Sequence, residues 1–276
     1  MLKMAITETI ETIDGGIAVE TFLPETVKYE APLLFVHGSS GGSWMWINFM
    51  NYFASEGWTC HALNLRGHHE SRPVSDWGEV GVDAYIDDVE RVIRWIGKDL
   101  VLIGHSMGGV LAQKYAAMNN PLKLILLHTA PPKEIVQKID FNAFLKRGKE
   151  KGRVMDKKVL QSDGDKEKLL GYMFDPGNVD PEILEMTNKK MCQESARAIQ
   201  EMKEVVVDPK KITCPVYVLG FDLKKIGLNY SLDLSSELKK FYGARDYQVI
   251  EPGGHLFMLE KNWQEFAAAI KHWLLD

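Results

Sequence analysis

A serine in a glycine-flanked turn is the first residue of this sequence whose surroundings suggest chemistry. Ser106 stands between Gly104 and Gly108, after an apolar run typical of a buried strand and before a segment with the composition of a helix. A strand that turns sharply into a helix strains the serine backbone, and glycines two positions away on each side relieve the crowding. The helix N-terminus also favours negative charge beside the hydroxyl. The pattern predicts a nucleophilic serine, with a helix-capping serine as the alternative.

A serine hydroxyl needs a base within hydrogen-bond reach, and His255 is the candidate among eight histidines. It follows the pair Gly253-Gly254, after the last expected strand and before the last expected helix. The two glycines allow a sharp turn that presents the imidazole at the sheet edge. We therefore expect His255 to take the serine proton, and the alternative is a histidine of a surface loop.

The stretch HGSSGG, residues 37–42, is a glycine-rich turn after another apolar run. Such a turn can point backbone N–H groups into a cleft, where they stabilise charge that develops on a carbonyl oxygen. The expected donors are the N–H of Met107, directly after the serine, and the N–H of Ser39. The hydroxyl of Ser40 is the alternative to Ser39, and His37 is expected to be structural.

Four motifs in this order resemble those of the α/β-hydrolase fold, in its lidded, lipase- or esterase-like members. They are HGSSGG (37–42), LRGHHES (65–71), GHSMGG (104–109) and GGHLFMLE (253–260). The resemblance covers essentially the whole chain. A serine in the turn, where the haloalkane dehalogenase and epoxide hydrolase branches have aspartate, argues against those branches.

The resemblance implies a nucleophile at Ser106, a base at His255 and oxyanion donors at Ser39 and Met107. It also implies no cofactor, and the sequence suggests no metal site. His69 is a departure, because the family usually has glycine at that position of the RGHHES motif. Exposure at the surface is the favoured interpretation of His69.

The third member of the triad is the second departure. An acid must hold the imidazole tautomer and stabilise the imidazolium, and the family places it three residues after the glycine that ends a strand. Here that residue is Leu223, and Asp222 comes one position early. Asp222 is the first choice, Asp233 the second and Glu134 the third. A missing acid would indicate a weak or non-hydrolytic member.

Strands that alternate with helices must position these residues. The sequence predicts a hairpin over residues 5–23, strands over 33–36, 58–63, 100–103, 122–127, 216–219 and 246–250, and helices over 44–56, 82–96 and 259–274. Apolar strands in this arrangement predict an α/β fold, with a mostly parallel β-sheet covered by helices on both faces. Active sites of such sheets lie at the carboxyl ends of the strands, here in loops that begin at His37, Arg66, His105 and Gly220.

Residues 133–212 break the alternation. They carry about twice the density of charged residues found elsewhere and contain no convincing strand. We expect an all-helical cap there, inserted between the parts of a core domain formed by residues 1–132 and 213–276. Its apolar face would line a substrate pocket. The candidate pocket residues from cap and core are Ser40, Trp44, His105, Phe144 and Phe174.

Bulk composition limits the partners. The chain has 276 residues and a net charge of −5, and it has no basic block, which argues against nucleic-acid binding. Three widely spaced cysteines argue against a disulfide framework and a zinc site. There is no signal-peptide pattern and no 18-residue apolar run, so a cytoplasmic protein without a membrane span is expected. The expected partner is a small-molecule substrate, and a homodimer is left open.

The first functional hypothesis is a serine hydrolase that cleaves a carboxylic ester, a thioester or a lactone through an acyl-enzyme. A second uses the same site for C–C bond hydrolysis, cofactor-free perhydrolase or haloperoxidase chemistry, or elimination of the hydroxynitrile-lyase kind. A third is a non-catalytic small-molecule receptor. Fold and triad are shared among these activities, so the sequence does not separate the first two.

Overall fold

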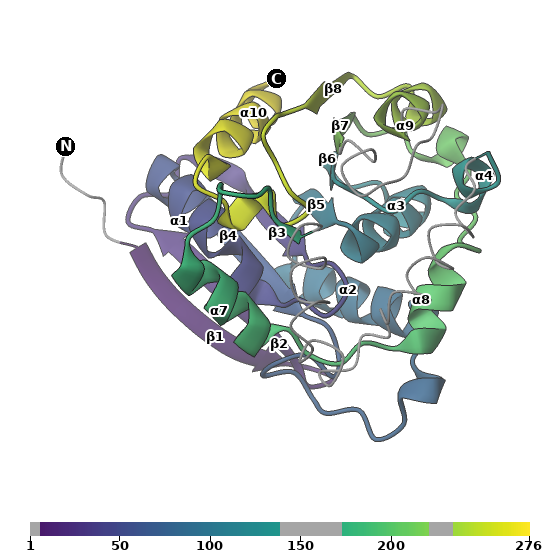
Figure 1. The fold of residues 1–276 in the computed structure, drawn as a ribbon, viewed down its shortest axis with the longest axis horizontal. Helices are drawn as coiled ribbons and strands as arrows, with labels where there is room; N and C mark the ends of the chain where they lie inside the picture. The colour runs from purple at the N-terminus through teal and green to yellow at the C-terminus, as the bar shows by residue number, and fades with distance from the viewer. Residues whose placement is uncertain (1–5, 139–172, 221–233) are drawn as a thin grey trace.

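The computed structural model describes residues 6–138, 173–220 and 234–276. Their centre is an eight-stranded sheet with the order β1-β2-β4-β3-β5-β6-β7-β8 (Figure 1). The strands are β1 Ile6–Ile13, β2 Ile17–Pro24, β3 Tyr29–Val36, β4 Trp58–Asn64, β5 Val101–His105, β6 Lys123–Leu127, β7 Val216–Gly220 and β8 Asp246–Val249. The described helices are α1 Ile47–Glu56, α2 Val82–Ile96, α3 Met107–Asn119, α4 Lys133–Val136, α7 Pro181–Lys190, α8 Ala196–Met202, α9 Leu234–Tyr242 and α10 Trp263–Leu275.

The sheet is mostly parallel, as the sequence predicted. β1 and β2 form the expected antiparallel hairpin, which turns at Gly15 and Gly16 with φ of 80° and 72°, and β2 pairs with β4 in the antiparallel sense. Every other pair, from β4-β3 to β7-β8, is parallel. The carboxyl ends of β3, β5 and β7 therefore lie at one edge of the sheet.

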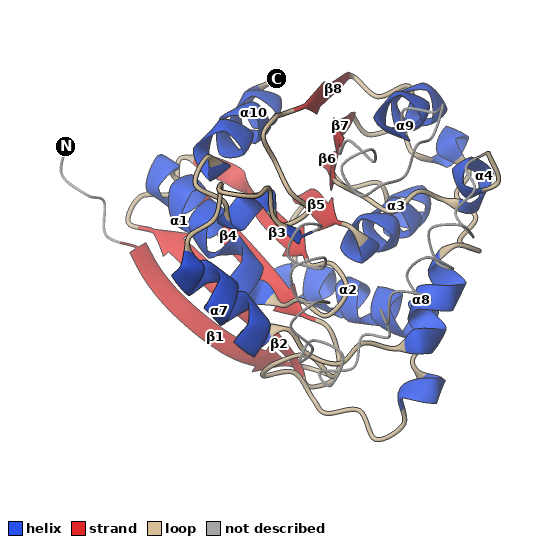
Figure 2. Ribbon diagram, viewed as in Figure 1, coloured by secondary structure: helices blue, strands red, loops and turns tan. Residues whose placement is uncertain are grey.

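Helices cover both faces of the sheet (Figure 2). On one face α2, α3 and α9 contribute buried side chains such as Tyr85 and Leu111 to one core. On the other, α1 and α10 contribute Phe49, Phe266 and Trp273 to a second core. Strands between these two cores are buried on both sides, which explains their continuous apolar sequences.

Two helix boundaries differ from the prediction. The closing helix begins at Trp263 rather than Leu259, because Glu260 takes an extended backbone after a short 3₁₀ turn over Phe257–Leu259. The segment expected as a helix from Trp44 starts as a 3₁₀ turn over Ser43–Trp46 and becomes α-helical at Ile47. By contrast, α2 occupies the expected residues 82–96, because its apolar stripe faces the core and Gly97 ends it with φ of 64°.

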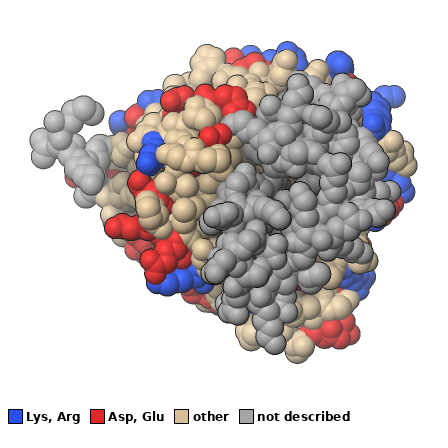
Figure 3. All heavy atoms as spheres, in the orientation of Figure 1, with Lys and Arg blue, Asp and Glu red and all other residues tan. Residues whose placement is uncertain are grey.

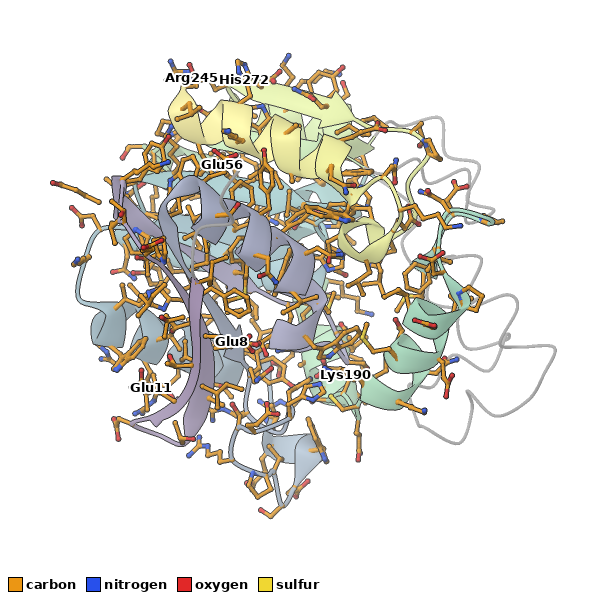
Figure 4. All side chains as sticks on the ribbon, turned by 90° about the vertical axis from the view of Figure 1, so that its left-hand side faces the viewer. Glu8, Glu11, Glu56, Lys190, Arg245 and His272 are labelled. Carbon is orange, nitrogen blue, oxygen red and sulfur yellow. The ribbon has the colours of Figure 1, made fainter. Side chains whose placement is uncertain are left out.

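The described part of residues 133–212 contains α4, α7, α8 and a 3₁₀ turn over Pro209–Lys211, and no strand among those described residues. The end of α7 approaches the hairpin, where Lys190 and Glu8 both act electrostatically on the buried Glu20 (Figure 4). Burial, the largest effect there, raises the pKa of Glu20. The division of the chain into core and cap domains stays a prediction.

Charged side chains of both signs are spread around the rim of the described surface in the view of Figure 3. Lys271 of α10 forms an ion pair with Glu56 of α1 at 2.8 Å, and Arg245 forms one with Asp276 at 2.7 Å. Among the helices of the described ranges, none combines the length and the apolar character that a membrane crossing requires.

We expect Gly104→Ala to lower the free energy of unfolding by about 1–3 kcal/mol, because β5 and α3 leave no room for a methyl group. A β-carbon there would lie 2.7 Å from the Gly109 Cα and 2.9 Å from the Ala112 Cβ. Urea unfolding monitored by tryptophan fluorescence measures the change. The matched control is Gly78→Ala at an exposed glycine, with an expected change within about 0.5 kcal/mol. Equal losses in the two variants would contradict the prediction.

Candidate active site

Ser106 links the last residue of β5 to the first residue of α3. Its backbone has φ of 52° and ψ of −118°, a conformation that is strained for a residue with a side chain. The surroundings are closely packed. A β-carbon on Gly38 would lie 2.9 Å from the Ser106 Cβ, and one on Gly108 would collide with the carbonyl oxygens of Val36 and His37. Glycine at these positions therefore allows the serine turn and the neighbouring 37–42 turn to meet.

His255 reaches the serine from the loop after β8. Its Nε2 lies 3.0 Å from Oγ of Ser106, within hydrogen-bond distance. The loop is held on both sides of the histidine, since the N–H of Gly254 donates to Glu260 at 2.9 Å and the N–H of Leu256 donates to the Met173 carbonyl at 2.7 Å. These backbone bonds fix the loop that carries the imidazole.

Three histidine rings converge beside the serine. The ring of His105 lies 4.6 Å from that of His255, and the ring of His128 lies 6.1 Å from it. His105 is buried, and its Nε2–H donates to the His255 carbonyl at 2.9 Å, so its proton is on Nε2. Among the described residues, no group of three or more histidine, cysteine, aspartate or glutamate side chains is arranged to hold a metal ion.

Burial, followed by the charge of His128, lowers the pKa of His255 to about 3. The imidazole is therefore neutral at pH 7 and its Nε2 can accept a proton from Ser106. Burial likewise lowers the pKa of His105 well below its ordinary value. Both imidazoles are therefore uncharged at pH 7.

The glycine-rich turn is held by His37, as the sequence suggested. Nε2 of this buried ring accepts from the Leu65 N–H at 3.1 Å, so Nδ1 carries the proton and donates to the Gly38 carbonyl at 2.7 Å. Burial lowers the pKa of His37 to about 3, so the ring stays neutral. Both ring nitrogens are thus used in support of the turn.

The two expected oxyanion residues adjoin each other. The hydroxyl of Ser39 donates to Sδ of Met107 at 3.6 Å, which brings the 37–42 turn against the start of α3. The N–H of Ser40 points elsewhere and donates to Glu194 at 3.0 Å. Ser40 is buried, and its positive φ of 59° reverses the direction of the chain within the 37–42 turn. The roles of Ser39 and Met107 as donors stay predictions.

Glu194 is a buried residue of the site region that sequence reasoning missed. Besides the Ser40 amide, its carboxylate accepts from the Tyr85 hydroxyl at 2.5 Å, from the Ser195 N–H at 2.7 Å and from Nε2 of His68 at 3.2 Å. Only 6% of the residue is exposed. It comes from the segment between α7 and α8, and it therefore ties residues 133–212 to the glycine-rich turn.

His68 faces Glu194 as an imidazolium. Its Nδ1 lies 3.0 Å from the Arg66 carbonyl and its Nε2 lies against the glutamate carboxylate, so both nitrogens must donate. Burial lowers the pKa of His68, but hydrogen bonds and charge from Cys192 and Glu194 outweigh it and raise the pKa to about 10. Burial raises the pKa of Glu194, and the bonds from His68 and Tyr85 bring it below its ordinary value. The two form a buried ion pair.

A second buried glutamate ties the same insertion to the histidine loop. Glu260 accepts from the N–H of Asp175 at 2.5 Å and from the side chain of Asn178 at 2.8 Å, in addition to the Gly254 amide. The backbone of Phe174, whose side chain is buried, packs directly on Gly254. Phe174 thus lies next to the loop of His255.

The structure places Trp44 and His69 together. Nε1–H of the buried Trp44 donates to Nε2 of His69 at 3.0 Å. His69 is exposed, as expected, and has φ of 45°, a conformation that glycine would adopt freely.

Three predicted residues, Phe144, Asp222 and Asp233, lie outside the described residues. Glu134 lies at the start of α4, where its charge acts on Tyr242, whose hydroxyl donates to Gln113 at 2.6 Å. The assignment of the triad acid therefore stays a prediction.

Comparison with known proteins agrees with the fold and the motifs. The sequence profile of the alpha/beta hydrolase family matches residues 33–269. A bifunctional esterase/perhydrolase of Acinetobacter calcoaceticus is 34% identical over 128 residues, which are 45% of this chain and 45% of that protein. The match thus spans less than half the length of that relative.

Solved structures extend the likeness to nearly the whole chain. A bacterial membrane phospholipase A has a TM-score of 0.70 and 24% identity, and the match covers 98% of this chain and 86% of that one. A thermophilic esterase of Thermogutta terrifontis has a TM-score of 0.65 and 21% identity, with 98% of both chains covered. At these identities the likeness concerns the fold.

We expect Glu194→Gln to lower the free energy of unfolding by about 3–5 kcal/mol near pH 6, because it leaves His68 charged and buried without a partner. The pair's own contribution depends on pH. Because the pKa of Glu194 is lowered, its contribution to the free energy of unfolding is present above the unfolded value of 4.5 and is lost in acid. Because the pKa of His68 is raised, its contribution is fully present below 6.5 and is lost as the pH rises towards about 10. The stability difference between wild type and variant should therefore shrink from pH 6.5 to 10.

Urea unfolding at a series of pH values measures this difference. Glu204→Gln is the control, because it breaks only the exposed pair with Lys133 and is expected to change stability by less than about 1 kcal/mol. A Glu194→Gln variant as stable as the control, or a difference that does not vary with pH, would exclude the buried ion pair.

Proposed function

The chain belongs to the alpha/beta hydrolase family, and on that premise we propose that it hydrolyses a carboxylic ester through an acyl-enzyme, with Ser106 as nucleophile. The observation that carries the proposal is the 3.0 Å separation of Ser106 Oγ and His255 Nε2 at a strained strand-to-helix turn. A hydroxyl presented in this way, beside a neutral imidazole, is the arrangement that nucleophilic catalysis needs.

The proposed reaction has two halves. Ser106 attacks the ester carbonyl as His255 Nε2 takes its proton, and the N–H groups of Met107 and Ser39 stabilise the oxyanion. His255 then protonates the departing alcohol, which leaves an acyl-enzyme. In the second half, water attacks the acyl group with His255 again as base, and the acid leaves.

Asp222 is the proposed acid that orients His255. In the sequence it comes two residues after β7, whose carboxyl end lies at the same sheet edge as the serine turn. An acid at this place would hold Nδ1–H of the imidazole and stabilise the imidazolium. Asp233 is the second choice for this acid, and Glu134 is the third.

The substrate is proposed to be a small, partly apolar ester, with thioesters and lactones as close variants. The helical insertion 133–212 is the proposed cap, and its Phe174 lies beside the histidine loop. Phe144, Trp44, Ser40 and His105 are the other proposed contacts of the pocket. His105 also donates to the His255 carbonyl and so supports the loop of His255.

Perhydrolysis is the second candidate, because a curated relative is an esterase/perhydrolase. In that reaction hydrogen peroxide takes the place of water in the second half, so the same acyl-enzyme gives a peracid. Peracid formation from nitrophenyl acetate and hydrogen peroxide, measured with the wild type and with Ser106→Ala, distinguishes this activity from simple hydrolysis.

We expect a fluorophosphonate probe to label Ser106 in the folded enzyme, with the modified peptide identified by mass spectrometry. Ser106→Ala should abolish both labelling and hydrolysis of nitrophenyl acetate, butyrate and octanoate. Ser55→Ala, at an exposed serine of α1, is the control and should keep both. No label on folded wild-type protein would overturn the proposal, and a label without hydrolysis of any of the three esters would favour another reaction of the same serine.

Asp222→Asn should lower kcat by about 10⁴-fold with little change in folding, since the imidazole would be held in the wrong tautomer. Steady-state kinetics with the best nitrophenyl ester measures the loss. Asp233→Asn provides the comparison within the same segment. A loss below threefold for Asp222→Asn would transfer the assignment to Asp233 or Glu134.

A further inference from the structure

Glu260 is a buried carboxylate of the loop that carries His255, and the proposed reaction gives it no part. Only 1% of the residue is exposed. One of its oxygens accepts the N–H of Gly254, the residue before His255, at 2.9 Å, and also the N–H of Asp175 at 2.5 Å. The other oxygen accepts from Nδ2 of Asn178 at 2.8 Å. Three donors from two distant parts of the chain therefore converge on one side chain.

The backbone before His255 needs such bonds because two glycines precede the histidine. Glycine allows the chain more conformations than any other residue, so neither Gly253 nor Gly254 restricts the direction in which the chain enters His255. Gly254 is required by the insertion, since a β-carbon there would lie 2.4 Å from the Phe174 Cα. The position of the imidazole therefore depends on hydrogen bonds that reach this backbone from elsewhere.

Three consecutive residues around the imidazole are held by such bonds. Glu260 holds the first through its N–H. The second is His255, whose carbonyl accepts from Nε2–H of His105 at 2.9 Å. The third is Leu256, whose N–H donates to the Met173 carbonyl at 2.7 Å. The Glu260 bond is the one that a substitution can remove without altering the residue before the nucleophile.

Asn178 links the insertion to this carboxylate. Besides its bond to Glu260, Nδ2 of Asn178 donates to Oδ1 of Asn262 at 2.7 Å, and its backbone carbonyl accepts from the Lys261 N–H at 2.8 Å. Nδ2 of Asn262 in turn donates to the Pro252 carbonyl at 2.8 Å. These bonds join the two ends of the loop that carries the imidazole.

We propose that Glu260 is a positioning residue for His255, and that Asn178 couples the insertion to the base through it. The proposal rests on the proposed function, because His255 matters there as the base. An ionised carboxylate accepts on both oxygens, so it binds the loop and the insertion at the same time. A displacement of a reacting group by about 1 Å can lower the rate about 100-fold. The insertion thus contributes to the position of the base as well as to the pocket.

Exchange of the two side-chain groups tests the link. Glu260→Gln must turn its amide towards Asn178 to keep an oxygen for the two backbone N–H groups, so two donors face each other. Asn178→Asp places two carboxylates there instead. Each variant should lower kcat at least about tenfold and change KM less than about twofold, because the loss concerns the reacting groups rather than substrate binding. In the double variant the amide donates to the carboxylate, and kcat should exceed that of both single variants at least about threefold.

Steady-state hydrolysis of the best nitrophenyl ester, well below the unfolding temperature, measures kcat and KM. Glu265→Gln, at an exposed glutamate of α10, and Asn119→Asp, at the exposed end of α3, are the matched controls and should keep both constants. A kcat of Glu260→Gln within about threefold of the wild type, a change in KM alone, or a double variant no faster than the single variants would overturn the proposal.

Hydrogen exchange of the peptide that contains Gly254 and Leu256 tests the positioning without any reaction. Exchange should be at least about tenfold faster in Glu260→Gln and in Asn178→Ala than in the wild type, and unchanged in Glu265→Gln. Asn178 is partly exposed, so Asn178→Ala serves if Glu260→Gln does not fold. Equal exchange in wild type and variants would contradict the positioning. If the wild type neither hydrolyses esters nor labels at the nucleophile, the proposed function fails, and exchange alone decides whether Glu260 holds the loop.

Discussion

The close approach of two turns at the carboxyl ends of β3 and β5 is the constraint on which the rest of the site depends. Ser106 adopts a left-handed backbone that costs about 1–3 kcal/mol, and such strain persists only where the surroundings determine it. The surroundings here are backbone atoms in contact, since Gly38 and Gly108 leave no space for side chains. The 37–42 turn therefore packs directly against the turn that carries Ser106.

Two buried carboxylates join the helical insertion to this edge of the sheet. Glu194 binds the glycine-rich turn, and Glu260 binds the histidine loop together with Asp175 and Asn178. A buried carboxylate is stable only when several donors replace the lost water, and both glutamates have them. Residues of the insertion thus contact the glycine-rich turn on one side and the loop of His255 on the other, so their packing is part of the site's geometry.

Local patterns predicted the sheet, the serine turn and His255 because each depends on nearby residues. Helix α2 has an apolar stripe and a terminal glycine, and the serine turn has its two glycines. Glu194 could not be recognised in this way. It is one of many charged residues in a charge-dense segment, and only tertiary packing against Tyr85 and His68 buries it. The start of α10 was missed for a related reason, because Glu260 binds amides from elsewhere in the chain.

The bond from His105 to the His255 carbonyl has a consequence for how the site withstands motion. His105, the residue before Ser106, donates to the backbone carbonyl of His255, so the loop that carries His255 is tied directly to the serine turn. The separation of Ser106 Oγ and His255 Nε2 is then supported by a contact beside these two residues, and not only by the chain that joins β7 to β8. Changes of length or shape in that connection can then leave the 3.0 Å between Ser106 Oγ and His255 Nε2 unchanged.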